Sequence, residues 1–377
     1  MPKAERIPAE CGIFFGMPFE RYVLLDAYNF HSLKHVQRSM EMFKHHWDHG
    51  DEPDREALLF GRVFHTWLFE PQHASRRYCQ TPAVYPLVES AESGYTVRPV
   101  PPKDGLHWCV RKKNSRKPEE TWGVALAYDE EADDWQPVGD APEGSYRLIL
   151  KPWFAASTYC THWKRDRELQ GVQIITQDMG MSAREMADRL RALPWVAEHL
   201  DGADCEVVAV WDDPQTGLRC KLRLDAVHCQ ERLVTILDGK KTHKSAAYDS
   251  FPWEVHRYSY ATQAAMYVEG LQHAYRALGE DRDVASFVFL VAEDMPPYTP
   301  AVYGIGCHEV LRSGAWYGYG AQQWHGWLQQ VKLALDNDWW SGHNNAAPGS
   351  VTGVEELPIP DGLKDRIVPL AWNITGD

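Results

Sequence analysis

The sequence predicts an α/β fold in which helices flank a central mixed β-sheet. Two observations support this prediction. Short apolar runs, several with an alternation of period two, fall between residues 205 and 306, and stretches with apolar residues at helical spacing separate and follow them. A chain of 377 residues is long for one minimal domain and short for three, so we expect one elaborated domain with an inserted subdomain.

Composition and patterning divide the chain into four expected parts. Residues 1–79 are the helical N-terminal part of the main domain. Residues 80–150 are rich in proline, glycine and charge, which indicates an insertion whose role the sequence does not assign. Residues 151–345 hold the core, and residues 346–377 form a tail rich in proline and glycine.

In the N-terminal part, a loose arm of the first eighteen residues precedes two expected helices. The first helix lies within residues 26–50 and starts at a polar cap near Asn29 or Ser32. The second helix begins near Arg55, and Pro71 stops it.

The core elements alternate between helices and strands. They are, in order, a helix over residues 182–200, hairpin strands near 205–211 and 218–229, a strand over 232–240, a long amphipathic helix over 253–279, strands over 284–294 and 298–306, and a helix over 308–337.

The bulk properties narrow the class of protein. Apolar residues make up 44% of the chain and charged residues 24%, with no apolar run long enough to span a membrane. The N-terminus lacks the apolar stretch of a signal peptide, so we expect the protein in the cytoplasm. The eight cysteines include no Cys-x-x-Cys pair, which argues against a zinc ribbon. The net charge of −14 is unusual for a protein that binds nucleic acid, although basic residues cluster over 111–117 and 164–167.

One group of charged residues points to chemistry. In the strand over 232–240, period-two alternation puts Asp238 and Lys240 on one face, roughly 6.5–7 Å apart. Asp225 occupies a polar-face position on the preceding strand, so two carboxylates and an ammonium can converge. Such a set suits a hard cation and phosphodiester hydrolysis, whereas an ordinary ion pair at the rim of a sheet is the alternative.

This pattern resembles the catalytic core of the PD-(D/E)xK nuclease superfamily. It is most similar to the RecB-like exonucleases of the exonuclease VIII (RecE) type, including phage and prophage relatives. Their core has an Asp at the end of one strand and Asp-x-Lys-x-Thr on the next, matched here by Asp225 and by Asp238, Lys240 and Thr242. The proline that names the superfamily is replaced by Leu224.

Other segments match the same group in the same order. The stretch "ALLFGRVFHTWLFEP" resembles its Gly-x-x-x-His helix, which implies that His65 is a metal ligand. The stretch "YSYATQAAMYVEG" resembles its Gln-x-x-x-Tyr helix, which implies that Gln263 and Tyr267 contact DNA or support the site, with Thr242 beside them. Glu206 stands where the superfamily often has a further acidic metal ligand.

The resemblance implies a restriction-endonuclease-like core and a Mg²⁺-dependent exodeoxyribonuclease, with Mn²⁺ as a possible substitute. Asp225, Asp238 and Lys240 would be catalytic, and His65, Asp225, Asp238 and Glu206 would hold the metal. The enzyme would degrade one strand from double-stranded DNA ends, 5′ to 3′, for a single-strand annealing protein of the RecT-like kind, and could form a ring. Two alternatives remain at this point: a scaffold that binds DNA ends or a partner protein without cleavage, and an endonuclease on the same fold.

Overall fold

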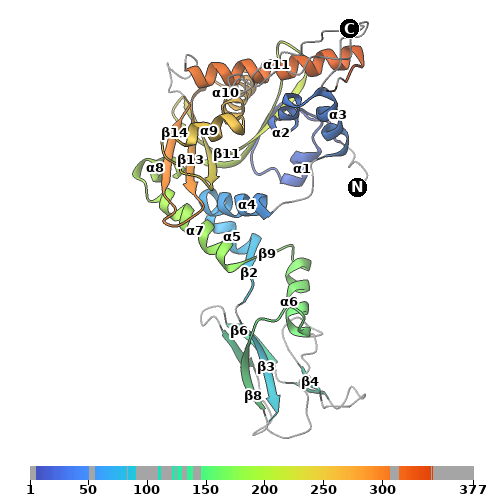
Figure 1. Ribbon diagram of the computed structural model, residues 1–377, viewed down its shortest axis with the longest axis vertical. Helices are drawn as coiled ribbons and strands as arrows, with labels where there is room; N and C mark the ends of the chain where they lie inside the picture. Colours follow the sequence, from blue (N-terminus) through green and yellow to red (C-terminus); the bar gives the residue numbers. More distant parts are fainter. Residues whose placement is uncertain are drawn as a thin grey trace, which may run out of the picture.

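The computed structural model describes residues 6–50, 56–82, 84–90, 109–111, 121–123, 125–129, 134–138, 146–305, 314–340 and 342. Figure 1 shows a helix-covered sheet at one end and an extension at the other. The expected tail over 346–377, and much of the expected insertion over 80–150, lie outside the described residues.

A six-stranded mixed sheet forms the centre of the protein, as the sequence predicts. Its strand order is β1-β10-β11-β12-β13-β14, and every neighbouring pair is antiparallel except β12 with β13. The strands are β1 (Gly12–Phe14), β10 (Asp204–Asp212), β11 (Arg219–Gln230), β12 (Leu233–Thr242), β13 (Asp283–Glu293) and β14 (Pro300–Gly304). The parallel pair needs a long crossover, which a helical segment between β12 and β13 provides.

Helices cover both faces of this sheet. On one face, α10 packs against β10, β11 and β13, and α11 packs against α10; on the other, α4 and α7 contact β12 and β13. The helices are α1 (Phe19–Leu24), α2 (Phe30–Leu33), the 3₁₀ helix η1 (Lys34–Gln37), α3 (Met40–His49), α4 (Glu56–Phe69), α5 (Pro71–Arg77), α6 (Thr158–Leu169), α7 (Gln177–Arg191), α8 (Pro194–Leu200), α9 (Phe251–Arg257), α10 (Tyr260–Ala277) and α11 (Ala315–Asn337).

The strands alternate their side chains between two separate apolar cores. Leu224, Ile236 and Phe289 belong to the core beneath α10, whereas Ala226 and Leu237 belong to the core beneath α4 and α7. A strict period-two alternation along this strand of the predicted hairpin would put Ala226 on the same face as Leu224, and the structure does not follow it. The alternation shifts between these two residues, at the position of Asp225.

Three stretches that the sequence predicts as single helices are interrupted: 26–50, 182–200 and 253–279. In the first, Ser39 is extended and its hydroxyl accepts a hydrogen bond from the Met42 amide, so it starts a new helix as an N-cap. In the second, Pro194 lacks the amide hydrogen that a continuing helix needs. In the third, Ser259 has a left-handed backbone, with φ of 58°.

The N-terminal arm is not loose as predicted, because it carries the edge strand β1 and is fastened to the sheet. The ammonium of Lys221 on β11 donates hydrogen bonds to the carbonyls of Tyr22 (2.9 Å) and Leu25 (2.7 Å), at the end of α1. A cation is favourable there because the C-terminal end of a helix carries partial negative charge. These hydrogen bonds hold α1 beside β11, and the pairing of β1 with β10 holds the arm on the sheet.

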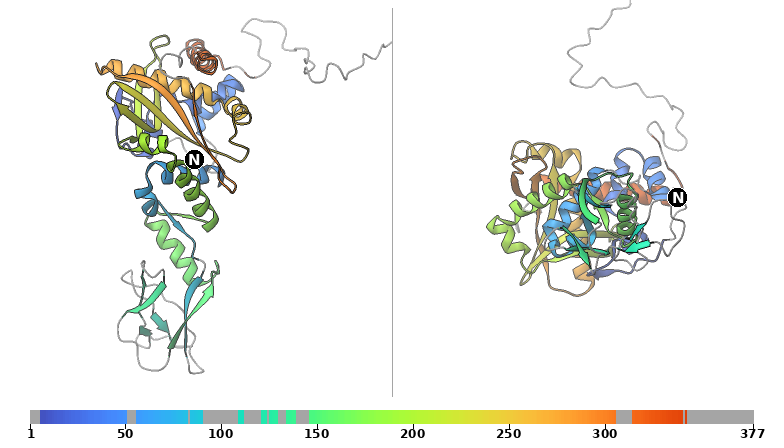
Figure 2. Two further views of the ribbon diagram at one scale, coloured as in Figure 1. Left: turned by 90° about the vertical axis from the view of Figure 1, so that its left-hand side faces the viewer. Right: turned by 90° about the horizontal axis from the view of Figure 1, so that it is seen from below.

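The extension begins at a narrow parallel pair of strands, β2 (Tyr78–Gln80) and β9 (Gln173–Ile175). Figure 2 shows β3 and β8 beyond this pair, standing away from the main sheet. Within its described residues, the extension has three antiparallel strand pairs: β3 (Val84–Ser90) with β8 (Tyr146–Pro152), β4 (Cys109–Arg111) with β5 (Thr121–Gly123), and β6 (Ala125–Asp129) with β7 (Asp134–Val138). None of the helices that the structure describes is long and apolar enough to cross a membrane.

The contact between α10 and α11 depends on a glycine. A Cβ atom on Gly320 would overlap the Ala261 carbonyl, whereas one on Gly318 of the same helix meets nothing within 4 Å. We expect Gly320→Ala to lower the free energy of unfolding by roughly 2–4 kcal/mol, because backbone must move. Gly318→Ala, the matched control, should raise it by up to about 1 kcal/mol through helix propensity. Urea denaturation compares the two, and equal midpoints would contradict this helix contact.

Candidate active site

The site lies where β11 and β12 separate. Their pairing runs from Gln230–Leu233 to Ala226–Leu237 and stops, while β12 continues alongside β13 as far as Thr242. Asp225 and Asp238 are the next residues on the two strands after the last pair. The amide of Gly239 donates a hydrogen bond to Asp225 Oδ2 (2.9 Å), so a carboxylate replaces the missing partner strand. Separation of the strands thus places the two carboxylates side by side.

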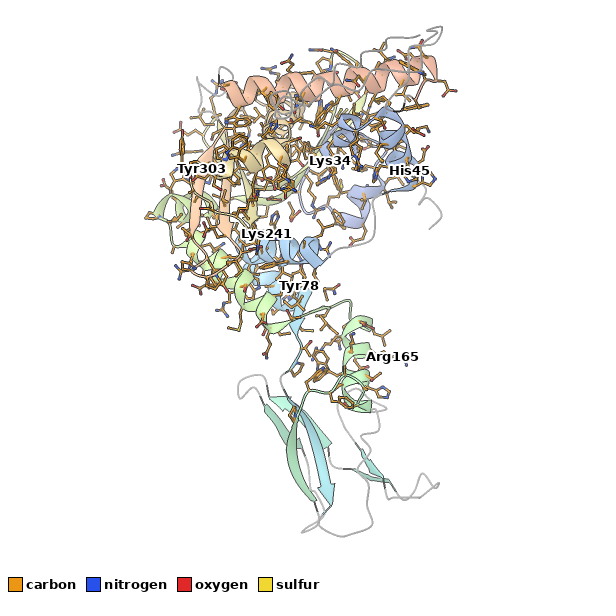
Figure 3. All side chains as sticks on the ribbon, in the orientation of Figure 1. Lys34, His45, Tyr78, Arg165, Lys241 and Tyr303 are labelled. Atoms are coloured by element: carbon orange, nitrogen blue, oxygen red, sulfur yellow. The ribbon has the colours of Figure 1, made fainter. Side chains whose placement is uncertain are left out.

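Asp238 is 3% exposed and has partners on two sides. The ammonium of Lys240 forms an ion pair with Asp238 Oδ2, and the amide of Gln263 on α10 donates a hydrogen bond to Asp238 Oδ1 (3.1 Å). Lys241 points the other way, because its ammonium lies 5.1 Å from the Phe60 ring of α4 (Figure 3). The predicted alternation along β12 is therefore present.

His65 reaches the same point from α4. Its Nδ1 lies 3.4 Å from Asp225 Oδ1, and its Nε2 lies 2.9 Å from the carbonyl oxygen of Gly239. A carbonyl only accepts, so Nε2 carries a hydrogen and donates it to Gly239. This bond fixes the ring with Nδ1 facing Asp225. The structure thus brings His65, Asp225, Asp238 and Lys240 together.

Burial and charge shift the pKa values within this group. Burial raises the pKa of Asp238 to about 6, even though the Lys240 ammonium opposes the change. Burial also disfavours the charged forms of the other three groups, but charged neighbours outweigh it. Asp225 raises the pKa of His65, His65 lowers the pKa of Asp225, and Asp238 raises the pKa of Lys240. At neutral pH, Lys240 is charged and both carboxylates are predominantly ionised.

Glu206 lies on β10 next to Asp225 but is engaged elsewhere. Its carboxylate forms an ion pair with Arg223, whose guanidinium also donates to the Met17 carbonyl (3.2 Å). Burial raises the pKa of Glu206, and Asp225 contributes in the same direction, which reflects their closeness. Glu206 has a φ of 56°, a conformation that costs energy for a residue with a side chain. The carboxylate is thus near the site and paired with a cation.

Two predicted residues remain, Tyr267 and Thr242, and both are buried. Tyr267 is buried on α10, one turn after Gln263, and burial raises its pKa well above the ordinary value. Thr242 is also buried; its hydroxyl accepts a hydrogen bond from the Lys244 amide (3.0 Å), and its carbonyl accepts one from the Asp294 amide (2.8 Å). Thr242 therefore shapes the turn after β12.

Sequence reasoning missed two residues of the site. The Lys240 ammonium lies 4.6 Å from the ring centroid of Tyr260, a cation–π distance. Tyr260 precedes Gln263 by three residues on α10, so helical spacing could have placed it beside Asp238. Gly239 was also missed. A Cβ atom there would lie 3.0 Å from Phe69 and 3.3 Å from His65 Nε2, which leaves little room for any other residue.

The donors present suit a divalent cation, although they do not form a ready-made cage. Across the described ranges, no group of three His, Cys, Asp or Glu side chains is placed to hold a metal ion as it stands. Asp238 Oδ2 is buried and its partner is the Lys240 ammonium, so a metal ion bound here would share this carboxylate with Lys240. With its Nε2 hydrogen committed to Gly239, a neutral His65 offers the Nδ1 lone pair beside Asp225. Two carboxylates and an imidazole are ligands that Mg²⁺ or Mn²⁺ accepts.

Comparison with known proteins gives one family match. Residues 156–343 match the family described as a PDDEXK-like domain of unknown function (DUF3799). These residues include Glu206, Asp225, Asp238 and Lys240, whereas His65 lies before them. No curated protein matches the chain.

Two solved structures show weak likeness. A provisionally assigned exonuclease from Eubacterium rectale has 15% identity and a TM-score of 0.33, over 53% of this chain and 71% of that one. The protein SSO0001 has 12% identity and a TM-score of 0.24, over 49% of this chain and 89% of that one. The family match carries the assignment: residues 156–343 form a PDDEXK-like domain of the PD-(D/E)xK nuclease superfamily.

Proposed function

We propose that this protein is a divalent-metal-dependent DNA nuclease whose active site is built around Asp225, Asp238 and Lys240. The observation that carries the proposal is the meeting of these three side chains where β11 and β12 separate, inside a PDDEXK-like domain. An ordinary rim ion pair would leave unexplained the buried carboxylate, the histidine and the amide that converge on the same point.

In this proposal each residue has a distinct task. Asp225, Asp238 and His65 hold a divalent cation, with Glu206 as a further ligand if it leaves Arg223. When bound, the cation stabilises negative charge on the phosphate and lowers the pKa of a bound water. Lys240 keeps its proton because Asp238 is adjacent, so its ammonium donates to the attacking water or to a phosphate oxygen. Gln263 fixes the orientation of Asp238, and Tyr267 and Thr242 support the site from behind.

The finer assignments rest on the resemblance to exonucleases of the RecE type. We propose cleavage from double-stranded DNA ends, 5′ to 3′, with Mg²⁺ as the natural cation, in the cytoplasm. An annealing protein would take up the exposed strand, and a ring of subunits would keep the enzyme on DNA. We also propose that residues 80–150 are an insertion into the nuclease domain; β2 and β9 then form its stem.

Gln263 provides a test of how Asp238 is positioned. We expect Gln263→Leu to reduce the rate of DNA cleavage by roughly 10- to 100-fold, because Asp238 loses the donor that orients it. Gln272→Leu, on the same helix, is the control for loss of a buried amide distant from the site. Single-turnover rates at saturating metal compare the two variants. Equal rates for Gln263→Leu and wild type would remove Gln263 from the site.

The proposed function is tested on linear and covalently closed circular duplex DNA, with Mg²⁺ or with EDTA. Loss of linear DNA alone, only with Mg²⁺, is the expected result. Cuts in closed circles would replace the exonuclease with an endonuclease on the same fold. If neither DNA is cut with Mg²⁺ or Mn²⁺ while a labelled duplex end is still bound, the protein is a binding scaffold and the proposal fails.

A further inference from the structure

A strained turn between α9 and α10 lies next to the proposed active site. Ser259 has φ of 58° and ψ of 35°, the left-handed region that a residue with a side chain seldom adopts. It is 5% exposed, and its hydroxyl accepts a hydrogen bond from the Gln37 amide (2.9 Å). The carbonyl of Ser259 accepts a hydrogen bond from the backbone N–H of Gln263, whose side-chain amide donates to Asp238. The surrounding structure thus maintains a costly conformation at this turn.

The strained turn brings two tyrosine rings together. Tyr258 and Tyr260, on either side of Ser259, stack with ring centroids 5.5 Å apart and planes 30° apart. Tyr260 in turn lies beneath the Lys240 ammonium, at 4.6 Å. The two rings therefore form a row from Lys240 to the protein surface, where Tyr258 is 48% exposed. Packing explains Tyr260, which is half-buried, but it does not explain a stacked ring that faces solvent.

Positive charge accompanies these rings although the chain as a whole has a net charge of −14. The guanidinium of Arg257 lies 5.6 Å from the centroid of the Tyr258 ring, and Arg257 is exposed. Exposed aromatic rings with cations beside them are complementary to a strand of nucleic acid, since bases stack and phosphates pair with the cations.

We propose that Tyr258, supported by Tyr260, is a stacking platform for an unpaired base next to the bond that is cut. Arg257 pairs with the adjoining phosphate of the same strand. A base inside a duplex stacks on a neighbour on each side, whereas a base in an unpaired strand can turn a whole face to the ring, so the platform favours frayed or single-stranded DNA ends. This inference deepens the proposed nuclease function. It rests on that function because the nuclease proposal is what places the bond to be cut beside Lys240.

The platform is tested by binding in EDTA, so that no cleavage is required. A single-stranded oligonucleotide with a terminal 2-aminopurine reports stacking through loss of fluorescence. Wild type and Tyr258→Phe should quench the probe, whereas Tyr258→Ala should bind about tenfold more weakly and lose the quenching. Trp195→Ala, a ring on α8 that stacks on His199 at 3.8 Å, is the matched control and should behave as wild type. Equal affinity and quenching for Tyr258→Ala and wild type would overturn the proposal.

A cleavage assay distinguishes failure of this inference from failure of the proposed nuclease function. We expect wild type to cut a duplex with a short single-stranded tail faster than a blunt duplex, and Tyr258→Ala to lose that preference while it still cuts. A Tyr258→Ala variant that keeps the full preference would contradict the platform alone. A wild type that cuts no DNA with Mg²⁺ or Mn²⁺ would contradict the nuclease function, and the 2-aminopurine result would then decide the platform independently.

Discussion

Lys240→Ala is expected to lower the rate of DNA cleavage by about 10²- to 10⁴-fold, the range for removal of one charged group from a reacting phosphate or its water. Loss of the ammonium also removes the ion-pair partner of the buried Asp238, so part of the effect is electrostatic. Single-turnover cleavage of an end-labelled duplex, at saturating Mg²⁺, measures the rate. Lys240→Met keeps an unbranched apolar side chain in place of the lysine stem and should lose the same activity with a smaller loss of stability.

Lys241→Ala is the matched control for this prediction. Lys241 neighbours Lys240 on β12, but its ammonium faces Asp294 and Phe60 on the other side of the strand. Its loss should change cleavage by less than a factor of about three, because it removes an ion pair outside the site. If Lys241→Ala proves as inactive as Lys240→Ala, then the alternation along β12 does not define the active face.

Asp225→Asn is expected to weaken the binding of Mn²⁺ by at least about 100-fold. Removal of a group that hydrogen-bonds to a metal ligand already lowers metal affinity by about 10- to 100-fold, and Asp225 is proposed to be a ligand itself. The substitution keeps an oxygen to accept the Gly239 amide, so the turn of β12 should persist. Isothermal titration calorimetry without DNA measures the affinity, and circular dichroism checks the fold.

Asp212→Asn serves as the control for the loss of one negative charge. Asp212 lies at the end of β10 and pairs with Arg219, away from the group formed by His65 and Asp225. Its substitution should leave the affinity for Mn²⁺ within a factor of about two, since exposed charges are largely screened. A wild-type affinity for Asp225→Asn would place the metal elsewhere or remove it from the mechanism.

The sheet and its active face could be predicted from the sequence because their signals are local. Alternation along β12 separates Asp238 and Lys240 from Lys241, and the strand bounds match to within a few residues. The helices were predicted too long for a local reason as well. Helical spacing continues across Ser39 and Ser259 and hides both interruptions. The capping hydrogen bond at Ser39 comes from the nearby Met42, whereas the Gln37 contact at Ser259 joins residues far apart in the sequence.

The way in which the two carboxylates meet could not be predicted. The sequence puts each carboxylate on the polar face of its strand, but it does not give the register between the strands or the point at which β11 leaves β12, after Ala226–Leu237. On the neighbouring strand, Glu206 has a left-handed backbone beside the point where β11 leaves β12. Its ion pair with Arg223 could not be predicted from the spacing of residues in the sequence. Tyr260 was overlooked because its role depends on the Lys240 ammonium above its ring.

The central claim is that one divalent cation binds between Asp225 and Asp238. Anomalous diffraction from a crystal soaked in Mn²⁺ tests it most directly. The account predicts a single strong peak that both carboxylates contact, with His65 Nδ1 turned toward it and Lys240 still beside Asp238. A peak elsewhere, or no peak at these carboxylates in crystals whose protein cleaves DNA with Mn²⁺ in solution, would contradict the account.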